Sequence, residues 1–316
     1  MIFNIIKNKK GMFFTMLIIL LLSLFVLSYG FYSITKDREP VNKRIQTLNN
    51  FVFSVQEDLE RELYISGFRV IFLFEKRIVE ENEYISDIPG NFSEMMFNGT
   101  MNNGSYEGGL DLMEGVTFND IMTQMSETGA KINANVSNSS VPEFTISQDD
   151  PWKVKVNLQV DIAIKDNAGL ASWNRDIDLD VYIPVTNFED PIYYMETEGR
   201  VTNKILKTIH PDFTDDNEFE KHWKNSYYIA HNDAPSFLQR LQGDLSANPG
   251  GYGIESLINP ENLSDLGVTV TTKTLVDYRY FNSTDVGMPT SFDCRFSDLH
   301  IDNDHLPAPY DPTFSC

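Results

Sequence analysis

An uncharged apolar stretch near the N-terminus, Met12–Ile34, constrains this chain more than any other feature. About 20 apolar residues are enough for a helix to cross a bilayer, and a helix satisfies its own backbone hydrogen bonds without water. Lys7, Lys9 and Lys10 precede the stretch. The sequence therefore predicts a basic cytoplasmic region at residues 1–11 and a transmembrane helix at residues 12–35, with the lipid bilayer as a partner.

Three fates of this segment are compatible with the sequence. It is longer than the apolar core of about 7–15 residues that is usual in a signal peptide, which favours an uncleaved anchor. Ser28 and Gly30 are small residues at the spacing of a signal-peptidase site before Phe31. The third fate is a cut at the Lys9-Lys10-Gly11-Met12 segment.

That segment resembles the class III signal of archaeal type IV pilin-like proteins. The resemblance implies cleavage between Gly11 and Met12, so that the apolar helix becomes the N-terminus of the mature subunit. Such pilins often carry Glu at the fifth mature position, where this chain has Met16. The sequence leaves the three fates open.

Composition favours an extracellular location for the rest of the chain. The net charge of −21 excludes nucleic-acid binding and is compatible with cations or basic partners. Cys294 and Cys316 are the only 2 cysteines, and an even pair outside the cell predicts a disulfide, whose loop closure stabilises by ~3 kcal/mol. Asn-X-Ser/Thr triplets mark candidate glycosylation sites at Asn91, Asn98, Asn103, Asn135, Asn138, Asn262 and Asn282.

The positive-inside rule does not decide the orientation. Basic residues follow the span about as densely as the lysines precede it, at Lys36, Arg38, Lys43 and Arg44. The predicted disulfide, the triplets and the acidity together place the C-terminal domain outside a single-pass cell membrane protein.

A long amphipathic helix is expected after Asp37–Pro40, where proline interrupts the chain. Apolar residues recur at steps of three and four from Val41 to Ile78, which is the period of a helix with one buried face. Tyr64–Phe74 is apolar nearly all round and should lie inside the folded domain. Residues 36–86 are therefore predicted to form a helical stalk that is partly buried in the head.

Residues 87–316 are predicted to form an α+β head domain. Alternating apolar residues indicate strands at Trp152–Lys165 and Asp176–Val185, joined as an antiparallel hairpin, and a strand at Val268–Tyr280. Helices are expected at Asp120–Lys131 and Pro235–Leu241, and Asp87–Gly109 is expected to be an exposed loop. The predicted fold is a transmembrane helix running into a long amphipathic helix, packed by an antiparallel β-sheet head.

No catalytic constellation is recognisable, and we expect no enzyme activity. The candidate bases are His210, His222, His231, His300 and His305, and none lies in a nucleophile motif. Asp298, His300, Asp302 and Asp304 alternate in the C-terminal tail. They are a weak candidate site for calcium or another divalent cation, and a polar tail explains them equally well. No other cofactor is expected.

Four short blocks are similar to blocks in uncharacterised archaeal single-span surface proteins. They are Phe188–Tyr194, Ala234–Gly243, Gly253–Leu257 and Val276–Phe281. The resemblance implies location and architecture and carries no activity. We expect a membrane-anchored structural or adhesive protein, a pilin-like subunit of a surface filament or envelope, with copies of itself or other pilin-like subunits as partners. The alternative is a ligand- or cation-binding ectodomain.

Overall fold

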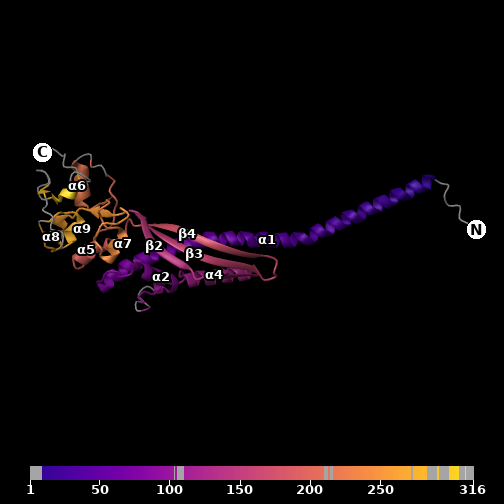
Figure 1. Cartoon of the computed structure of the whole chain (residues 1–316), viewed down its shortest axis with the longest axis horizontal. Helices are drawn as coiled ribbons and strands as arrows, with labels where there is room; N and C mark the ends of the chain where they lie inside the picture. Colours follow the sequence, from indigo (N-terminus) through magenta and orange to yellow (C-terminus); the bar gives the residue numbers. More distant parts are fainter. Residues whose placement is uncertain are drawn as a thin grey trace, which may run out of the picture.

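The computed structural model describes residues 9–102, 104, 110–209, 213, 216–271, 273–282, 290–291, 299–305 and 310. The molecule is elongated: the N-terminal helix projects from one end, a helix-and-sheet body forms the middle, and the C-terminal segments gather at the far end (Figure 1). Its helices are α1 (Lys9–Glu81), α2 (Ile88–Asn98), α3 (Leu110–Met113), α4 (Phe118–Lys131), α5 (Pro191–Glu196), α6 (Asp216–Lys224), α7 (Phe237–Gln242), α8 (Pro260–Asp265), α9 (Asp277–Phe281) and the 3-10 turn η1 (Asn303–His305).

Helix α1 runs unbroken through both the apolar stretch and the body of the molecule. Its segment Gly11–Ser33 is long and apolar enough to cross a membrane, and none of it is buried against the rest of the protein. From Leu48 onward the apolar face of the same helix is buried in the main core. The apolar helix therefore runs directly into the amphipathic one, and Pro40, where a boundary was expected, lies inside α1 at an exposed position where the missing hydrogen bond is tolerated. At ~1.5 Å per residue, the 73 residues of α1 span ~110 Å.

A four-stranded antiparallel sheet packs beside α1. It contains β1 (Ala134–Asn138), β2 (Glu143–Asp150), β3 (Lys153–Asp166) and β4 (Ser172–Pro184). Strands β3 and β4 pair along their whole length, from Lys153↔Pro184 to Lys165↔Ser172, which confirms the predicted hairpin. Strands β2 and β1 share the other edge of β3 one after the other.

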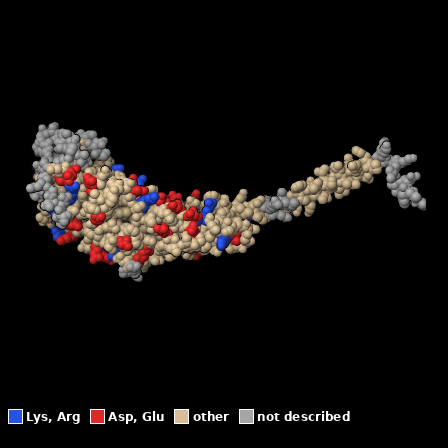
Figure 2. Space-filling view, viewed as in Figure 1, with Lys and Arg blue, Asp and Glu red and all other residues tan. Residues whose placement is uncertain are grey.

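Helices cover the apolar face of this sheet, and its other face is polar. Helix α1 contacts β3 and β4, α4 contacts β1, and α2 contacts β2. Gly67 lets α1 approach closely, since a Cβ there would lie 2.8 Å from Ile183 Cδ1. On the polar face, Lys155 pairs with Asp180 at 2.8 Å. Figure 2 shows charged residues spread over the body, whereas the tan part of the projecting helix, which holds the uncharged segment Gly11–Ser33, shows none.

Helix α2 corrects the expectation of an exposed loop at Asp87–Gly109. The Asp87 side chain accepts a hydrogen bond from the Gly90 amide and so caps the helix N-terminus, and Gly99 ends the helix in the left-handed conformation. Phe92 and Met95 between these caps are fully buried. The Gly- and Asn-rich composition concealed a short helix whose caps those residue types supply.

The C-terminal segments form a second hydrophobic core at the far end of the molecule. The elements of this region are α5, α6, α8 and α9, the short pairs β5 (Tyr228–Ala230) with β6 (Ile254–Ser256) and β7 (Thr290–Ser291) with β8 (His300–Ile301), and η1. Helix α7 lies between the two cores, because its Phe237 and Leu241 pack in the main core. The strand expected at Val268–Tyr280 is wrong, because its end is helix α9. Leu275 and Tyr278 are three residues apart, so the apolar spacing there already departed from the strand period of two.

Candidate functional site

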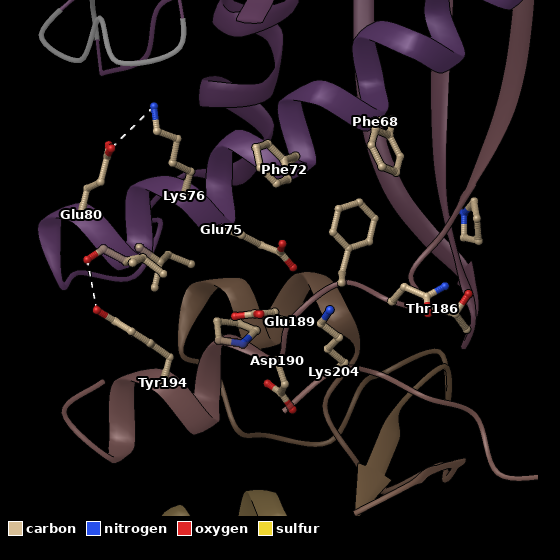
Figure 3. A pocket seen from close by; sticks show the side chains of 16 residues that line it. Phe68, Phe72, Glu75, Lys76, Glu80, Thr186, Glu189, Asp190, Tyr194 and Lys204 are labelled. Carbon is tan, nitrogen blue, oxygen red and sulfur yellow. Dashed lines mark hydrogen bonds and ion pairs between the residues drawn. The ribbon is translucent and has the colours of Figure 1, made fainter. Parts of the chain in front are cut away.

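A cavity of about 820 Å³ lies where the end of α1 meets the segment 184–204 (Figure 3). Phe68 and Phe72 of α1 contribute aromatic surface, and Phe188 packs on Phe68 with ring centroids 5.2 Å apart. The Tyr194 hydroxyl donates a hydrogen bond to the Val79 carbonyl at 3.2 Å and ties α5 to α1. The cavity wall is therefore mainly apolar and comes from two segments that are far apart in the sequence.

Glu75 is the polar group that distinguishes this cavity. It extends from α1 toward Glu189 (Figure 3), and its Oε1 atom has no hydrogen-bond partner in the described part of the chain. Burial, followed by the nearby negative charge of Glu189, raises the pKa of the Glu75 carboxyl to about 9. Glu75 is consequently neutral at pH 7 and offers a hydroxyl donor to the cavity.

A buried ionic network joins the elements of the second core. Arg240 on α7 donates to Asp190 Oδ2 at 2.5 Å and to Asp277 Oδ2 at 2.9 Å, and all three side chains are fully buried. The Tyr228 hydroxyl donates to Asp190 at 2.7 Å, and Ser256 donates to Asp277 at 3.0 Å. This network connects α5, α7, α9, β5 and β6 through charge-assisted hydrogen bonds.

A second buried cluster brings His231, Glu255 and His305 together. Glu255 Oε2 lies 3.2 Å from His231 Nδ1 and 3.1 Å from His305 Nε2. Asp302 Oδ1 lies 2.7 Å from the other ring nitrogen of His305. One atom from each of the three clustered residues falls within 4.8 Å of the other two, the spacing of a possible metal-ligand set.

The charges in this cluster shift the pKa values of its members in opposite directions. Burial alone would raise the pKa of Glu255, but His231 and His305, close beside its Oε2 atom, lower it to about 2. Burial alone would lower the pKa of His305, but its bonds to Asp302 and Glu255 raise it to about 9. His222, buried among aromatic rings, has its pKa lowered by burial to about 3 and is neutral.

The four blocks that carry the resemblance meet in these two clusters. Asp190 comes from the first block, Arg240 from the second, Glu255 and Ser256 from the third, and Asp277 from the fourth. Their composition alone indicated no chemistry. In the structure they supply the residues of two buried polar clusters, the Arg240 network and the Glu255 cluster.

The predicted cation set of the tail is placed only in part. Asp298 lies outside the described residues, and His300 is half-buried on β8. Asp302 and Asp304 both accept from Arg279, at 3.0 and 2.9 Å, and Asp302 also accepts from Thr274. The calcium site expected at these four residues stays a prediction, and the nearby cluster uses Asp302 with different partners.

The other predicted sites are distributed along the molecule. Asn98, Asn135, Asn138 and Asn262 are exposed and Asn282 is half-buried. Asn91 is buried inside α2, where its amide donates to the Asp87 carbonyl and accepts from the Asn102 amide, so it is not an accessible acceptor. Asn103, Cys294, Cys316 and His210 lie outside the described residues. Gly11 and Met12 lie on the first turns of α1.

Sequence reasoning missed both Glu75 and the His231–Glu255–His305 set. Glu75 appeared as one more charged residue on a predicted helix, and the histidines appeared only as isolated candidate bases. The signal that brings Glu255 to His305 is tertiary, because the two residues are 50 positions apart. The chain matches no protein-family model, and comparison with curated proteins and with solved structures finds no match.

Proposed function

We propose that this protein is a membrane-anchored extracellular structural or adhesive protein, a pilin-like subunit of a surface filament or envelope. The observation that carries the proposal is the continuity of α1, in which one helix supplies both the apolar segment Gly11–Ser33 and the central part of the main core. A continuous helix fixes the direction of the head relative to the span. An ordered assembly needs every head to point in the same direction, which a rigid helix provides. The head of a receptor can work on a flexible linker.

An aromatic stripe on the body of α1 supports contacts between copies. Four aromatic side chains of α1 are 40 to 53% exposed, and their spacing puts them on one side of the helix: Phe53, Tyr64, Phe68 and Phe72. Arg175 of β4 lies over the Phe53 ring and Phe68 packs on Phe188, so the stripe is covered only in part. Exposed aromatic surface of this kind favours protein–protein contact. A second copy, anchored in the same membrane by the same helix, would be held parallel and could bury this stripe.

The surface of the head supports an extracellular location. The net charge of −21 disfavours contact with anionic lipid, and the candidate acceptors Asn98, Asn135 and Asn262 are exposed. The proposal assigns no reaction to the chain.

The cavity at Glu75 favours one second candidate function, a ligand-binding ectodomain. A neutral carboxyl that faces apolar walls would donate a hydrogen bond to an otherwise apolar ligand, such as an ester or a ketone with a hydrocarbon body. A rise in melting temperature with such a ligand, abolished in Glu75→Ala, would favour this candidate over assembly.

The test of the proposed function compares two aromatic substitutions in cells. Phe72→Glu places a charge on the stripe, and Tyr182→Glu, at a position 43% exposed on β4, is the matched control. Antibody labelling of intact cells and electron microscopy should show the protein outside, in labelled filaments or a layer that Phe72→Glu disrupts and Tyr182→Glu does not. Monomers dispersed in the wild-type membrane would contradict the proposal.

A further inference from the structure

We propose that His231, Glu255 and His305 form a binding site for one divalent transition-metal ion, for which zinc is the representative probe. The site lies in the second core, between the segment after β5, strand β6 and η1. It is separate from the cavity at Glu75 and does not depend on the proposed structural role of the protein.

The spacing of the ligand atoms fits a small tetrahedral ion. Ligands at about 2.0–2.1 Å from tetrahedral zinc lie about 3.3 Å from one another. Glu255 Oε2 is 3.2 Å from His231 Nδ1 and 3.1 Å from His305 Nε2. All three atoms lie within 4.8 Å, so a small side-chain movement completes the spacing.

The hydrogen-bond pattern provides a second, independent observation. Glu255 is fully buried, and its Oε1 atom has no hydrogen bond of normal geometry in the described part of the chain, although the buried Tyr310 hydroxyl lies near the same carboxylate. His231 Nδ1 is also buried without an aligned hydrogen bond, although it lies close to the same carboxylate. Buried polar atoms without partners are costly. A metal ion would take the electron pair of His231 Nδ1 directly, and it would satisfy Glu255 Oε1 if the carboxylate binds it through both oxygens.

Asp302 completes the arrangement as a positioning residue. Its Oδ1 lies 2.7 Å from His305 Nδ1, so the Nδ1–H donates to Asp302 and directs Nε2 toward Glu255. A carboxylate behind a histidine ligand fixes the ring and raises its basicity. The Tyr278 hydroxyl, 3.3 Å from His305 Nε2, borders the same space. Asp302 is held in turn by Thr274 at 2.9 Å, so the support is ordered before an ion arrives.

The ligand types select the class of ion. Two imidazole nitrogens with one carboxylate suit zinc and neighbouring transition metals, whereas calcium takes six to eight oxygen ligands. When the ion binds, His305 Nε2 would release its proton to solvent. His305 Nδ1 would keep its proton, which donates to Asp302. The positive charge of the ion would then compensate the carboxylate of Glu255, while Asp302 is also paired with Arg279 at 3.0 Å.

A purely ionic cluster is the competing explanation. In that arrangement a protonated His305 bridges Asp302 and Glu255 and no ion is needed. It accounts for His305 but leaves Glu255 Oε1 and His231 Nδ1 without hydrogen bonds. The two explanations make different predictions for His231. If the cluster is a metal site, replacing His231 should weaken metal binding, whereas a purely ionic cluster binds no metal in the parent protein either.

The test measures metal binding to the full chain, purified in mild detergent and stripped with chelator. Zinc is titrated calorimetrically, and cobalt is added separately because its visible absorption reports tetrahedral coordination. We expect one ion per chain. His231→Gln should weaken zinc binding more than 100-fold, and Asp302→Asn should weaken it 10- to 100-fold. His300→Gln, a half-buried histidine of the same core outside the cluster, should leave affinity unchanged.

Each contrary outcome overturns the proposal. Circular dichroism and melting without metal establish that His231→Gln folds like the parent, and the side chain is 17% exposed, which favours tolerance. Failure of the parent to bind zinc or cobalt stoichiometrically would support the ionic cluster. Binding that is lost in His300→Gln and kept in His231→Gln would move the ion to the tail, and binding of calcium alone would exclude a nitrogen-rich site.

Discussion

Two buried glutamates show how their neighbours decide the chemistry of this acidic chain. Glu75 faces an apolar cavity and the like charge of Glu189, and its pKa rises to about 9. Glu255 is more deeply buried, yet His231 and His305 lower its pKa to about 2. The same side chain is therefore a neutral donor at one site and a carboxylate at the other.

Glu75 should make the stability of the protein fall as pH rises. Its pKa is 4.5 when exposed and about 9 in the folded protein, so unfolding releases its proton between these values. The folded state binds more protons there, and the free energy of unfolding decreases with pH until about pH 9. Glu75→Gln keeps the shape and removes the charge, so it should raise the free energy of unfolding at pH 8, by up to about 4–5 kcal/mol at ~1.36 kcal/mol for each pH unit above the exposed pKa.

Urea unfolding at pH 5 and pH 8 measures this difference. The advantage of Glu75→Gln should be much smaller at pH 5, because this pH lies close to the pKa of 4.5 of the exposed carboxyl and little of the pH-dependent loss of stability has yet occurred. Glu60→Gln, at an exposed position of the same helix, is the control and should differ little from the parent at either pH. An equal gain from Glu75→Gln at both values would show that packing rather than ionisation is responsible.

At the scale of elements, the sequence predicted those helices and strands whose formation depends on residues close to one another in the chain. The alternation of Val154, Val156 and Leu158 predicted β3, because a sheet with one buried face imposes a period of two. The helix predicted at Asp120–Lys131 is α4, which begins two residues earlier because Thr117 forms a capping box with Asp120. In α2, by contrast, capping residues were mistaken for loop composition.

The candidate sites could not be predicted in the same way. Arg240 meets Asp190 and Asp277 only after α5, α7 and α9 have packed together. The pKa of Glu75 is raised by a cavity whose other wall comes from residues more than a hundred positions later in the sequence. Burial and spatial proximity set both features, and a single sequence reveals neither.

Gly67 should be required where α1 crosses the sheet. A Cβ there would lie 2.8 Å from Ile183 Cδ1 and 3.3 Å from Val156 Cγ2, so a branched side chain would force β3 and β4 away from the helix. We expect Gly67→Val to lower the free energy of unfolding by about 1–3 kcal/mol through overpacking.

Gly30 offers the control on the same helix, because a Cβ there meets nothing within 4 Å. In detergent, Gly30→Val should leave the unfolding of the head unchanged. Chemical denaturation followed by tryptophan fluorescence compares the two variants, since Trp152 and Trp173 pack against the main core. Equal stability of Gly67→Val and the parent would mean that α1 and the sheet are not closely packed at this position.

At the scale of the whole molecule, the parts follow one another along the long axis, starting from the apolar segment Gly11–Ser33. The projecting segment of α1 lies at one end and the second core, with both buried polar clusters, at the other (Figure 1). Between them lies a body in which one helix face holds the sheet and another leaves aromatic residues exposed. This order suits a subunit that is anchored by one end, makes lateral contacts along its length and presents its far end to the surroundings.

The N-terminus of the native protein distinguishes this role from its alternatives. If the protein is a pilin-like subunit, the mature chain should begin at Met12. Removal of residues 1–11 takes away Lys7, Lys9 and Lys10 and leaves a helix end whose only charge is the new α-amino group, so the helix can leave the membrane for an assembly more easily. Mass spectrometry of the intact protein from native membranes measures this directly, and Gly11→Val should block the cut. A start at Met1 would favour a permanently anchored ectodomain. A start at Phe31 would remove most of the apolar segment and contradict membrane anchoring altogether.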